Sequence, residues 1–199
     1  MMKRLWIALI TGLMLTACGG QAETQDAQDK AAQTGDAHAV FLKAWLSGKK
    51  RGEALQKLAQ AGNPHAQVYL AHVKSAEGHA SDADKAIYRG WLENAAQNAM
   101  GEQHQTLSGL TYPLSGEAAF LIAEDYLGPD KLYGTDQSAA LKWLRTAADQ
   151  GQPAAMYKLA IRYQYGLDVD KDLAAAKSWM QKAADADWRD AVQGLKGLE

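Results

Sequence analysis

Apolar residues recur at helical spacing along most of this chain, and the pattern repeats itself. Trp143 and Trp179 are 36 residues apart, and Ala147 and Ala183 have the same spacing. Self-similarity at a period of this size is typical of solenoids, whose repeats are helix pairs that bury their apolar faces only by stacking. The pattern therefore predicts an all-α, right-handed solenoid of antiparallel helix pairs.

Breaker residues mark the turns within these pairs. Gly-Asn-Pro at 62–64 and Gly-Gln-Pro at 151–153 have the same Gly-x-Pro pattern. Glycine suits the end of a helix and proline suits the first turn of the next. The turn at 62–64 predicts a helix pair over 53–76, and an apolar stripe with Trp45 predicts a helix before it that ends near Gly48.

The next helix is predicted over 81–98, with Ser81 or Asp82 as its N-cap. Its partner begins late, because Trp91 precedes Ala118 by 27 residues whereas Trp143 precedes Ala155 by 12. The extra residues fall at 100–116, where glycine, proline and serine predict a loop rather than a helix. Insertions in solenoids often lie on the binding face, but a neutral surface insertion is an equally open interpretation.

Charge and composition exclude several classes of function. The net charge is −2, without the basic excess that is typical of nucleic-acid-binding proteins. The sequence contains no nucleophile-elbow, HExxH or phosphate-loop motif, so we expect no enzyme activity and no cofactor. His65, His72 and His79 are spaced seven apart, but they lack a closed ligand set, and we expect surface histidines and no metal.

Three aspartates, at 168, 170 and 172, precede the helix that carries Trp179. Alternating acids suggest calcium, but the loop lacks the glycine and the final glutamate of an EF-hand. Acids at the start of a helix are better explained by capping and by the helix dipole. A final amphipathic stretch with Trp188, Val192 and Leu195 predicts a capping helix.

The pattern A-x₃-L-x₃-Y-x₂-G, then A-x₂-W-x₃-A-A, resembles the Sel-one-like repeat, a relative of the tetratricopeptide repeat. The matching residues are Ala155, Leu159, Tyr163, Gly166, Ala176, Trp179, Ala183 and Ala184. The resemblance covers 139–186 most fully and extends through 85–138 to 53–84. It implies a helical domain over 38–199 that binds other proteins through outward positions on the first helix of each repeat.

Two columns of outward positions follow from the repeat register. The first contains Tyr69, Leu121 and Lys158, and the second Val73, Asp125 and Arg162. Arg162 and Tyr165 are plausible anchors for a partner. The candidate protein-binding residues, including two from the insertion, are Tyr69, Asp125, Lys158, Arg162, Tyr165, His104 and Tyr112.

The N-terminus has the features of an export signal. Lys3 and Arg4 precede the apolar run 5–15, which is too short to span a bilayer. Leu-Thr-Ala before Cys18 resembles the bacterial lipobox, which implies cleavage of 1–17, a lipid on Cys18 and membrane attachment. A plain secretory signal is the alternative. Residues 18–37 are then the lipidated cysteine and a disordered tether, because 19–37 contain no large apolar residue.

These resemblances imply a lipid-anchored protein of the bacterial envelope that faces the periplasm. Gly19, where aspartate would favour the inner membrane, implies the outer membrane. The partner is then a secreted toxin or an envelope protein. Lipoproteins with such repeats often act as immunity proteins against secreted antibacterial phospholipases. A scaffold for an envelope assembly and a peptidoglycan- or glycan-binding solenoid are the alternatives.

Overall fold

The computed structural model describes residues 36–78, 80–106, 109–128 and 132–197, so the predictions for the leader, Cys18 and most of the tether lie outside it. Its elements are α3 (Ala37–Trp45), η2 (Gly48–Lys50), α4 (Arg51–Gln60), α5 (Pro64–Glu77), α6 (Asp82–Asn98), β1 (Gln103–Gln105), β2 (Thr111–Pro113), α7 (Leu114–Tyr126), α8 (Gln137–Asp149), α9 (Pro153–Tyr165), α10 (Leu173–Asp185) and α11 (Arg189–Lys196). Within this part of the chain, no helix has both the length and the apolar character needed to cross a membrane.

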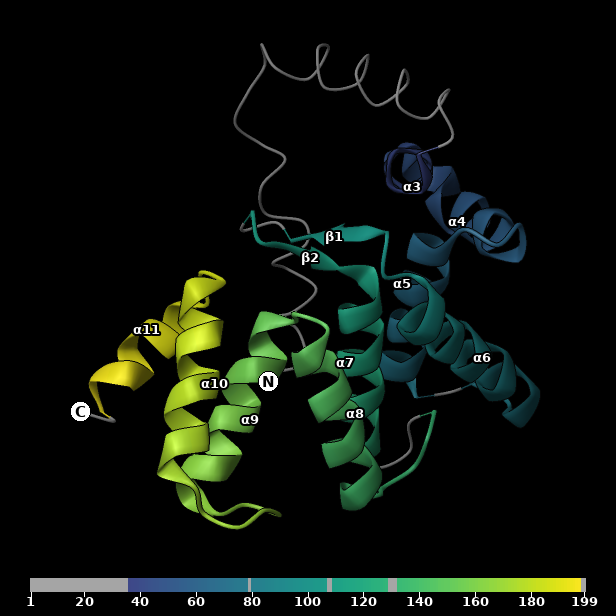
Figure 1. Cartoon of the computed structure of the whole chain (residues 1–199). Helices are drawn as coiled ribbons and strands as arrows, with labels where there is room; N and C mark the ends of the chain where they lie inside the picture. The colour runs from purple at the N-terminus through teal and green to yellow at the C-terminus, as the bar shows by residue number, and fades with distance from the viewer. Residues whose placement is uncertain (1–35, 79, 107–108, 129–131, 198–199) are drawn as a thin grey trace.

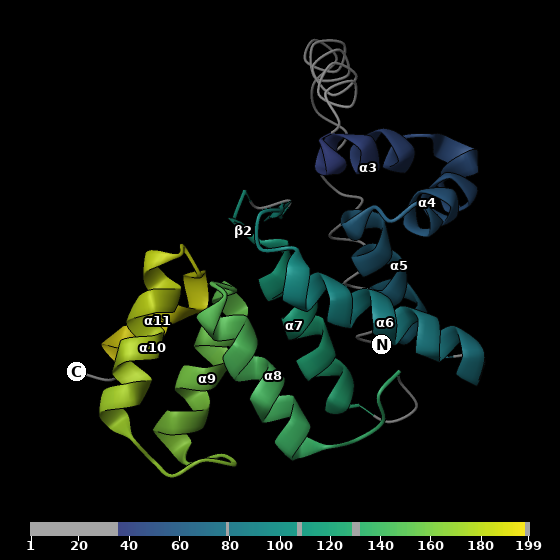
Figure 2. The same ribbon diagram turned by 45° about the vertical axis from the view of Figure 1, so that its right-hand side comes forward.

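The helices form antiparallel pairs that stack side by side (Figure 1). Each helix packs mainly on its neighbours in sequence, and α3 and α7 also contact α5. A second view places α3 and α4 at one end of the stack and α10 and α11 at the other (Figure 2). The predicted helical solenoid is confirmed, with α5–α6, α7–α8 and α9–α10 as successive pairs.

The second helix of each pair begins at a side-chain cap. Ser81, Asp136 and Asp172 each accept a hydrogen bond from the backbone N–H three residues further on. These bonds satisfy one of the free N–H groups at the helix start. Capping by Ser81 and Asp172 is therefore as predicted from the sequence.

The first helices of two pairs start with a tight turn. Gly62 and Gly151 have φ of 92° and 88°, a conformation that glycine adopts without a steric penalty. Asn63 and Gln152 then cap α5 and α9 through their side-chain oxygens. The same turn recurs one repeat later, before α11. Asp187 stands there in the place of Gly151 and has a positive φ of 59°.

Alanine makes the closest contacts between helices. The fully buried alanines are Ala59, Ala66, Ala71, Ala118, Ala119, Ala147, Ala148, Ala155, Ala160, Ala176, Ala183 and Ala191. The repeat tryptophans Trp91, Trp143 and Trp179 are partly buried and pack against this core, as predicted. Small residues at the contact allow the helix axes to come close, and the larger rings fill the space beside them.

The insertion differs from the prediction. The strands β1 and β2, at 103–105 and 111–113, pair as an antiparallel hairpin in which His104 lies opposite Tyr112, and α7 already begins at Leu114. The prediction of a loop rather than a helix is therefore wrong for residues 114–116, which lie in α7, and it did not include the two strands. The strands Gln-His-Gln and Thr-Tyr-Pro are too short to produce the alternating apolar pattern that signals a strand. Gly109 has a φ of 89° and reverses the chain between them.

Gly116 provides a test of the close helix packing. A Cβ at this position would lie 3.1 Å from the carbonyl oxygen of Gln150 and 3.3 Å from the Cβ of Gln152. We expect Gly116→Ala to lower the free energy of unfolding by about 1–3 kcal/mol, measured by chemical denaturation, because the α8–α9 turn must move.

Gly90→Ala is the matched control. Gly90 lies inside α6, and a Cβ there would have no heavy atom within 4 Å. This substitution should raise the free energy of unfolding by about 0.4–1 kcal/mol. Equal stability of the two variants would contradict the close contact at Gly116.

Candidate protein-binding groove

An open groove runs between α7 and α9, with α8 beneath it. Its volume is about 320 Å³. Its lining is formed by Ala123, Glu124, Leu127, Ala140, Leu144, Tyr157, Lys158, Ile161, Arg162 and Leu167. Ala140 and Leu144 of α8 are buried and form an apolar floor. The two walls are the first helices of successive repeats, where sequence register predicts a binding face.

Two ion pairs hold the cations of α9 along this groove. The Lys158 Nζ lies 2.8 Å from both carboxylate oxygens of Glu124 on the opposite wall. The Arg162 guanidinium donates to Asp168, just beyond α9. Both predicted cations are therefore in the groove, and each is fixed beside an acid. The rim presents positive and negative groups side by side rather than a field of one sign.

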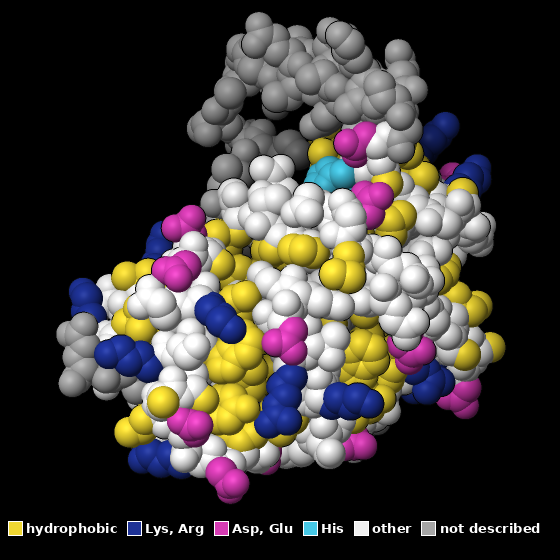
Figure 3. All heavy atoms as spheres, viewed as in Figure 1, with side chains coloured by type: hydrophobic (Ala, Val, Ile, Leu, Met, Phe, Trp, Pro, Cys, Tyr) yellow, Lys and Arg dark blue, Asp and Glu magenta, His cyan; other side chains and the backbone are white. Residues whose placement is uncertain are grey.

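Exposed apolar side chains accompany these charges. Leu127, just past the end of α7, is 39% exposed, Leu167 is about half exposed, and both line the groove. The predicted anchor Tyr165 is exposed at the end of α9, outside the groove lining. Figure 3 shows apolar side chains gathered between charged ones over the C-terminal helices on the face drawn there. This mixture of apolar surface and charged rim is typical of protein interfaces.

Asp125 is not an outward residue, and this expectation is wrong. Its side chain is only 2% exposed. The Tyr133 backbone N–H donates to one carboxylate oxygen at 2.8 Å, and the Ser75 hydroxyl donates to the other. Helix α5 and the segment that follows α7 therefore cover this carboxylate. It joins three parts of the chain and is unavailable to a partner.

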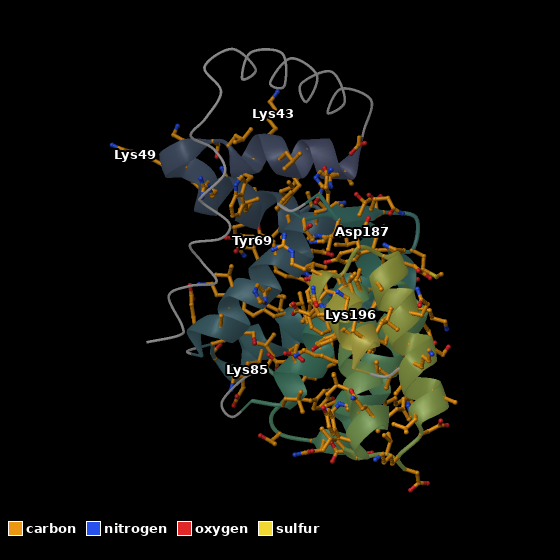
Figure 4. The ribbon with its side chains drawn as sticks, turned by 90° about the vertical axis from the view of Figure 1, so that its left-hand side faces the viewer. Lys43, Lys49, Tyr69, Lys85, Asp187 and Lys196 are labelled. Carbon is orange, nitrogen blue, oxygen red and sulfur yellow. The ribbon has the colours of Figure 1, made fainter. Side chains whose placement is uncertain are left out.

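Tyr69 is covered by the N-terminal helix. Its ring centroid lies 4.7 Å from that of Trp45 and 6.0 Å from that of Phe41, both on α3. Burial raises the pKa of the phenol above its ordinary value. In Figure 4, Lys43 and Lys49 point away from the molecule, whereas Tyr69 lies among the helices. The first position of the column predicted from Tyr69 is therefore partly covered by α3.

His104 and Tyr112 face each other across the hairpin, with ring centroids 5.3 Å apart. Tyr112 is only 7% exposed, and its hydroxyl donates to the Glu117 carboxylate at 2.9 Å. Burial raises the pKa of this phenol well above its usual range. Tyr112 therefore joins the hairpin to α7, and the expectation that it is open to a partner is wrong. His104 is half-buried, and burial lowers its pKa.

His65 also differs from the expectation of a surface histidine. It is 4% exposed at the start of α5. Its Nε2 lies 3.3 Å from a carboxylate oxygen of Glu102. His79 lies outside the described residues. Among those that are described, no group of three or more His, Cys, Asp and Glu side chains is arranged to hold a metal ion.

Sequence reasoning missed Glu124, Leu127, Ile161 and Leu167, which complete the groove. Leu127 and Leu167 each lie just past the end of a first helix, Leu127 after α7 and Leu167 after α9. A search for apolar residues just past the end of each first helix would have found them. The ion-pair partner Glu124 has no such signal, because its role depends on the distance between two helices.

The fold and groove define a helical repeat protein built from stacked antiparallel pairs. Residues 116–152 and 153–188 each match the Sel1 repeat, which confirms the predicted Sel-one-like repeat over these residues. These two segments, α7–α8 and α9–α10 with their turns, are therefore Sel1-like repeats. Repeats of this kind form extended surfaces that bind other proteins.

Known proteins with similar structure or sequence agree with this class. A protective antigen of uropathogenic Escherichia coli with an SLR fold superposes with a TM-score of 0.62 at 22% identity, over 98% of this chain and 40% of the antigen. A Sel1 repeat protein from Oxalobacter formigenes superposes with a TM-score of 0.52 at 23% identity, over 74% of this chain and 98% of that protein. The chitin synthase regulator SKT5 of Saccharomyces cerevisiae is 30% identical over 79 residues, 40% of this chain and 11% of the yeast protein.

Asp125→Ala tests the buried carboxylate. The change leaves the Tyr133 N–H and the Ser75 hydroxyl without their acceptor, so we expect the free energy of unfolding to fall by about 1–3 kcal/mol. Asp170→Ala, at an exposed position, should stay within about 0.5 kcal/mol of the wild type. Chemical denaturation measures both free energies of unfolding. If Asp125→Ala is as stable as the wild type, the carboxylate does not hold these segments together.

Proposed function

We propose that this protein is a lipid-anchored envelope protein that binds another protein through the α7–α9 groove. The groove itself carries the proposal, because it combines an apolar floor, half-exposed leucines on its walls and cations fixed at its rim. Ordered rim charges reduce the entropy that a partner must remove on binding. The occupant is an apolar segment of a partner protein, flanked by polar groups that match a rim of both signs.

The finer proposal is that this partner is an enzyme whose action the complex blocks. The yeast relative is named as a regulator of an enzyme, chitin synthase, which supports the use of such repeats on enzymes. In this proposal the protein is an immunity protein, and the partner is a secreted antibacterial toxin of the phospholipase type. A segment held in the groove would cover the toxin surface beside it.

Membrane attachment through Cys18 belongs to the same proposal. The support is the sequence Leu-Thr-Ala-Cys after an apolar run, with Gly19 favouring the outer membrane. A lipid at Cys18 and the tether that follows would hold the helical domain on the periplasmic side, close to the membrane that a phospholipase attacks.

A pull-down from envelope extract with the full chain as bait, read by mass spectrometry, tests the proposed function. One stoichiometric secreted hydrolase that loses its activity in the complex would support the immunity role. Several envelope proteins at lower occupancy would favour a scaffold. Recovery of purified peptidoglycan without protein would overturn the protein-binding proposal in favour of glycan binding.

Leu127→Arg tests the groove as the binding surface. A charged side chain on the wall opposes burial of an apolar segment, so we expect the dissociation constant for the recovered partner to rise at least tenfold, or about 1.4 kcal/mol. Isothermal titration calorimetry gives the value. Thermal unfolding should change little, because Leu127 is already 39% exposed.

Val192→Arg is the control for that substitution. Val192 is similarly exposed, at 45%, but lies on α11, away from the groove. It should leave the dissociation constant within about twofold of the wild type. If both variants weaken binding equally, or neither does, the groove is not the binding surface.

Cys18→Ser tests the anchor. The serine hydroxyl does not replace the lipidated thiol, so the protein should move from the membrane fraction to the periplasmic fraction while partner affinity is kept. Fractionation and immunoblotting measure the distribution. An unchanged membrane fraction would rule out the lipid at this residue as the anchor.

A further inference from the structure

Two histidines from distant parts of the chain, His38 and His65, meet where α3 and α5 join the hairpin, and His104 lies on the hairpin strand that His38 contacts. The His38 ring on α3 lies 4.7 Å, centroid to centroid, from the His65 ring on α5. His38 Nδ1 lies 3.2 Å from the Gln103 carbonyl oxygen in β1, next to His104. This histidine cluster, His38, His65 and His104, therefore contains one side chain from each element of the junction.

The cluster is part of the contact that fixes α3. Phe41 lies 6.0 Å from both the His65 and Tyr69 rings, and Trp45 packs edge-on against Tyr69. The Asn63 side-chain amide donates to the Ala37 carbonyl at 2.8 Å. Helix α3 thus covers His65 and Tyr69 with one stripe of rings, and it is the helix that must move for water to reach His65.

Burial and the neighbouring histidines oppose protonation of His65, the buried member of the cluster. Burial is the main cause that lowers the pKa of His65 to about 4, and the neighbouring His38 and His104 lower it further, whereas Asp36 acts in the opposite direction. Burial also lowers the pKa of His104, against the attraction of Glu117.

The remaining acid at the junction is Glu102, whose carboxylate is 3.3 Å from His65 Nε2 and is 39% exposed. The Glu102 carboxylate can accept a hydrogen bond from Nε2–H of a neutral His65. The contact seen in the structure therefore does not require a proton on Nδ1 as well. Tyr112 is the remaining ionisable group of the hairpin, and its phenol stays neutral because burial raises its pKa. A proton added to His65 would be a charge on a side chain that is only 4% exposed, and this burial outweighs the attraction of Asp36 and of the nearby Glu102 carboxylate.

We propose that the histidine cluster is an acid-sensitive latch. When the buried imidazole of His65 takes up a proton, α3 separates from α5 and the hairpin, and more of the aromatic surface of Tyr69 becomes accessible. The latch lies outside the groove between α7 and α9 and shares no residue with its lining. It would expose the first position of the column whose later members lie near that groove, so acid would enlarge the surface open to a partner.

The pKa of His65 in the two states determines how the opening equilibrium changes with pH. In the open state His65 titrates near its ordinary value of 6.5, whereas in the closed state its pKa is about 4. The closed state is therefore fully favoured above pH 6.5, and the advantage is lost as the pH falls toward 4. At pH 5 this difference shifts the opening equilibrium by on the order of tenfold.

Hydrogen exchange of the full chain, read by mass spectrometry at pH 7.5 and 5.0, tests the latch. Exchange times are scaled for the intrinsic pH dependence of amide exchange, and peptides from α9 are the internal reference. We expect α3 to exchange on the order of tenfold faster at pH 5.0 relative to α9. His65→Gln, which keeps a polar amide but does not titrate in this range, should reduce that ratio to less than about threefold.

His72→Gln is the matched control, because His72 is an exposed histidine on the same helix. It should keep the full acid effect. If His65→Gln opens α3 at both pH values, His104→Gln decides in its place, and it should also reduce the ratio, because burial lowers the pKa of His104. The latch is overturned if α3 and α9 respond equally to acid in the wild type, or if the histidine-cluster variants keep the full tenfold change.

Discussion

The close approach of helices through alanine is the constraint on which the solenoid depends. The alanines at equivalent places in successive pairs, such as Ala66, Ala118 and Ala155, are fully buried. A larger side chain there would separate the helices and tilt every later repeat, because each pair contacts only its neighbours. Gly116 against the α8–α9 turn is an extreme form of the same contact.

Equivalent helices meet through different chemistry along the stack, and this difference creates the groove. Between α3 and α5 the contact is filled by aromatic rings. Between α5 and α7 it is made by Ser75 and the buried Asp125. Between α7 and α9 the ion pair of Glu124 and Lys158 spans an opening with α8 beneath it. A repeated backbone thus presents different surfaces at equivalent helices, and the groove lies between α7 and α9.

The sequence predicted what depends on local chemistry. Turns at glycine and proline, the cap at Asp172 and the core tryptophans follow from residue type and spacing within one repeat. Burial of Asp125 and His65 could not be predicted, because the groups that cover them come from α3, α5 and the segment after α7. Register aligned Asp125 with Arg162, but the two positions have different neighbours, so one is buried and the other lines the groove.

The two ends of the stack are fixed by unlike contacts. At the C-terminal end, α11 packs on the fully buried Met180, and a Cβ on Gly194 would come within 2.8 Å of that side chain. This contact is apolar and does not titrate. At the other end, α3 packs on α5 through rings that include His38 and His65. Since apolar packing is insensitive to protons and a buried imidazole is not, acid weakens the contact that holds α3 and leaves the Met180 contact unchanged. The α7–α9 groove, whose apolar floor lies in the interior repeats, keeps its shape while that end opens.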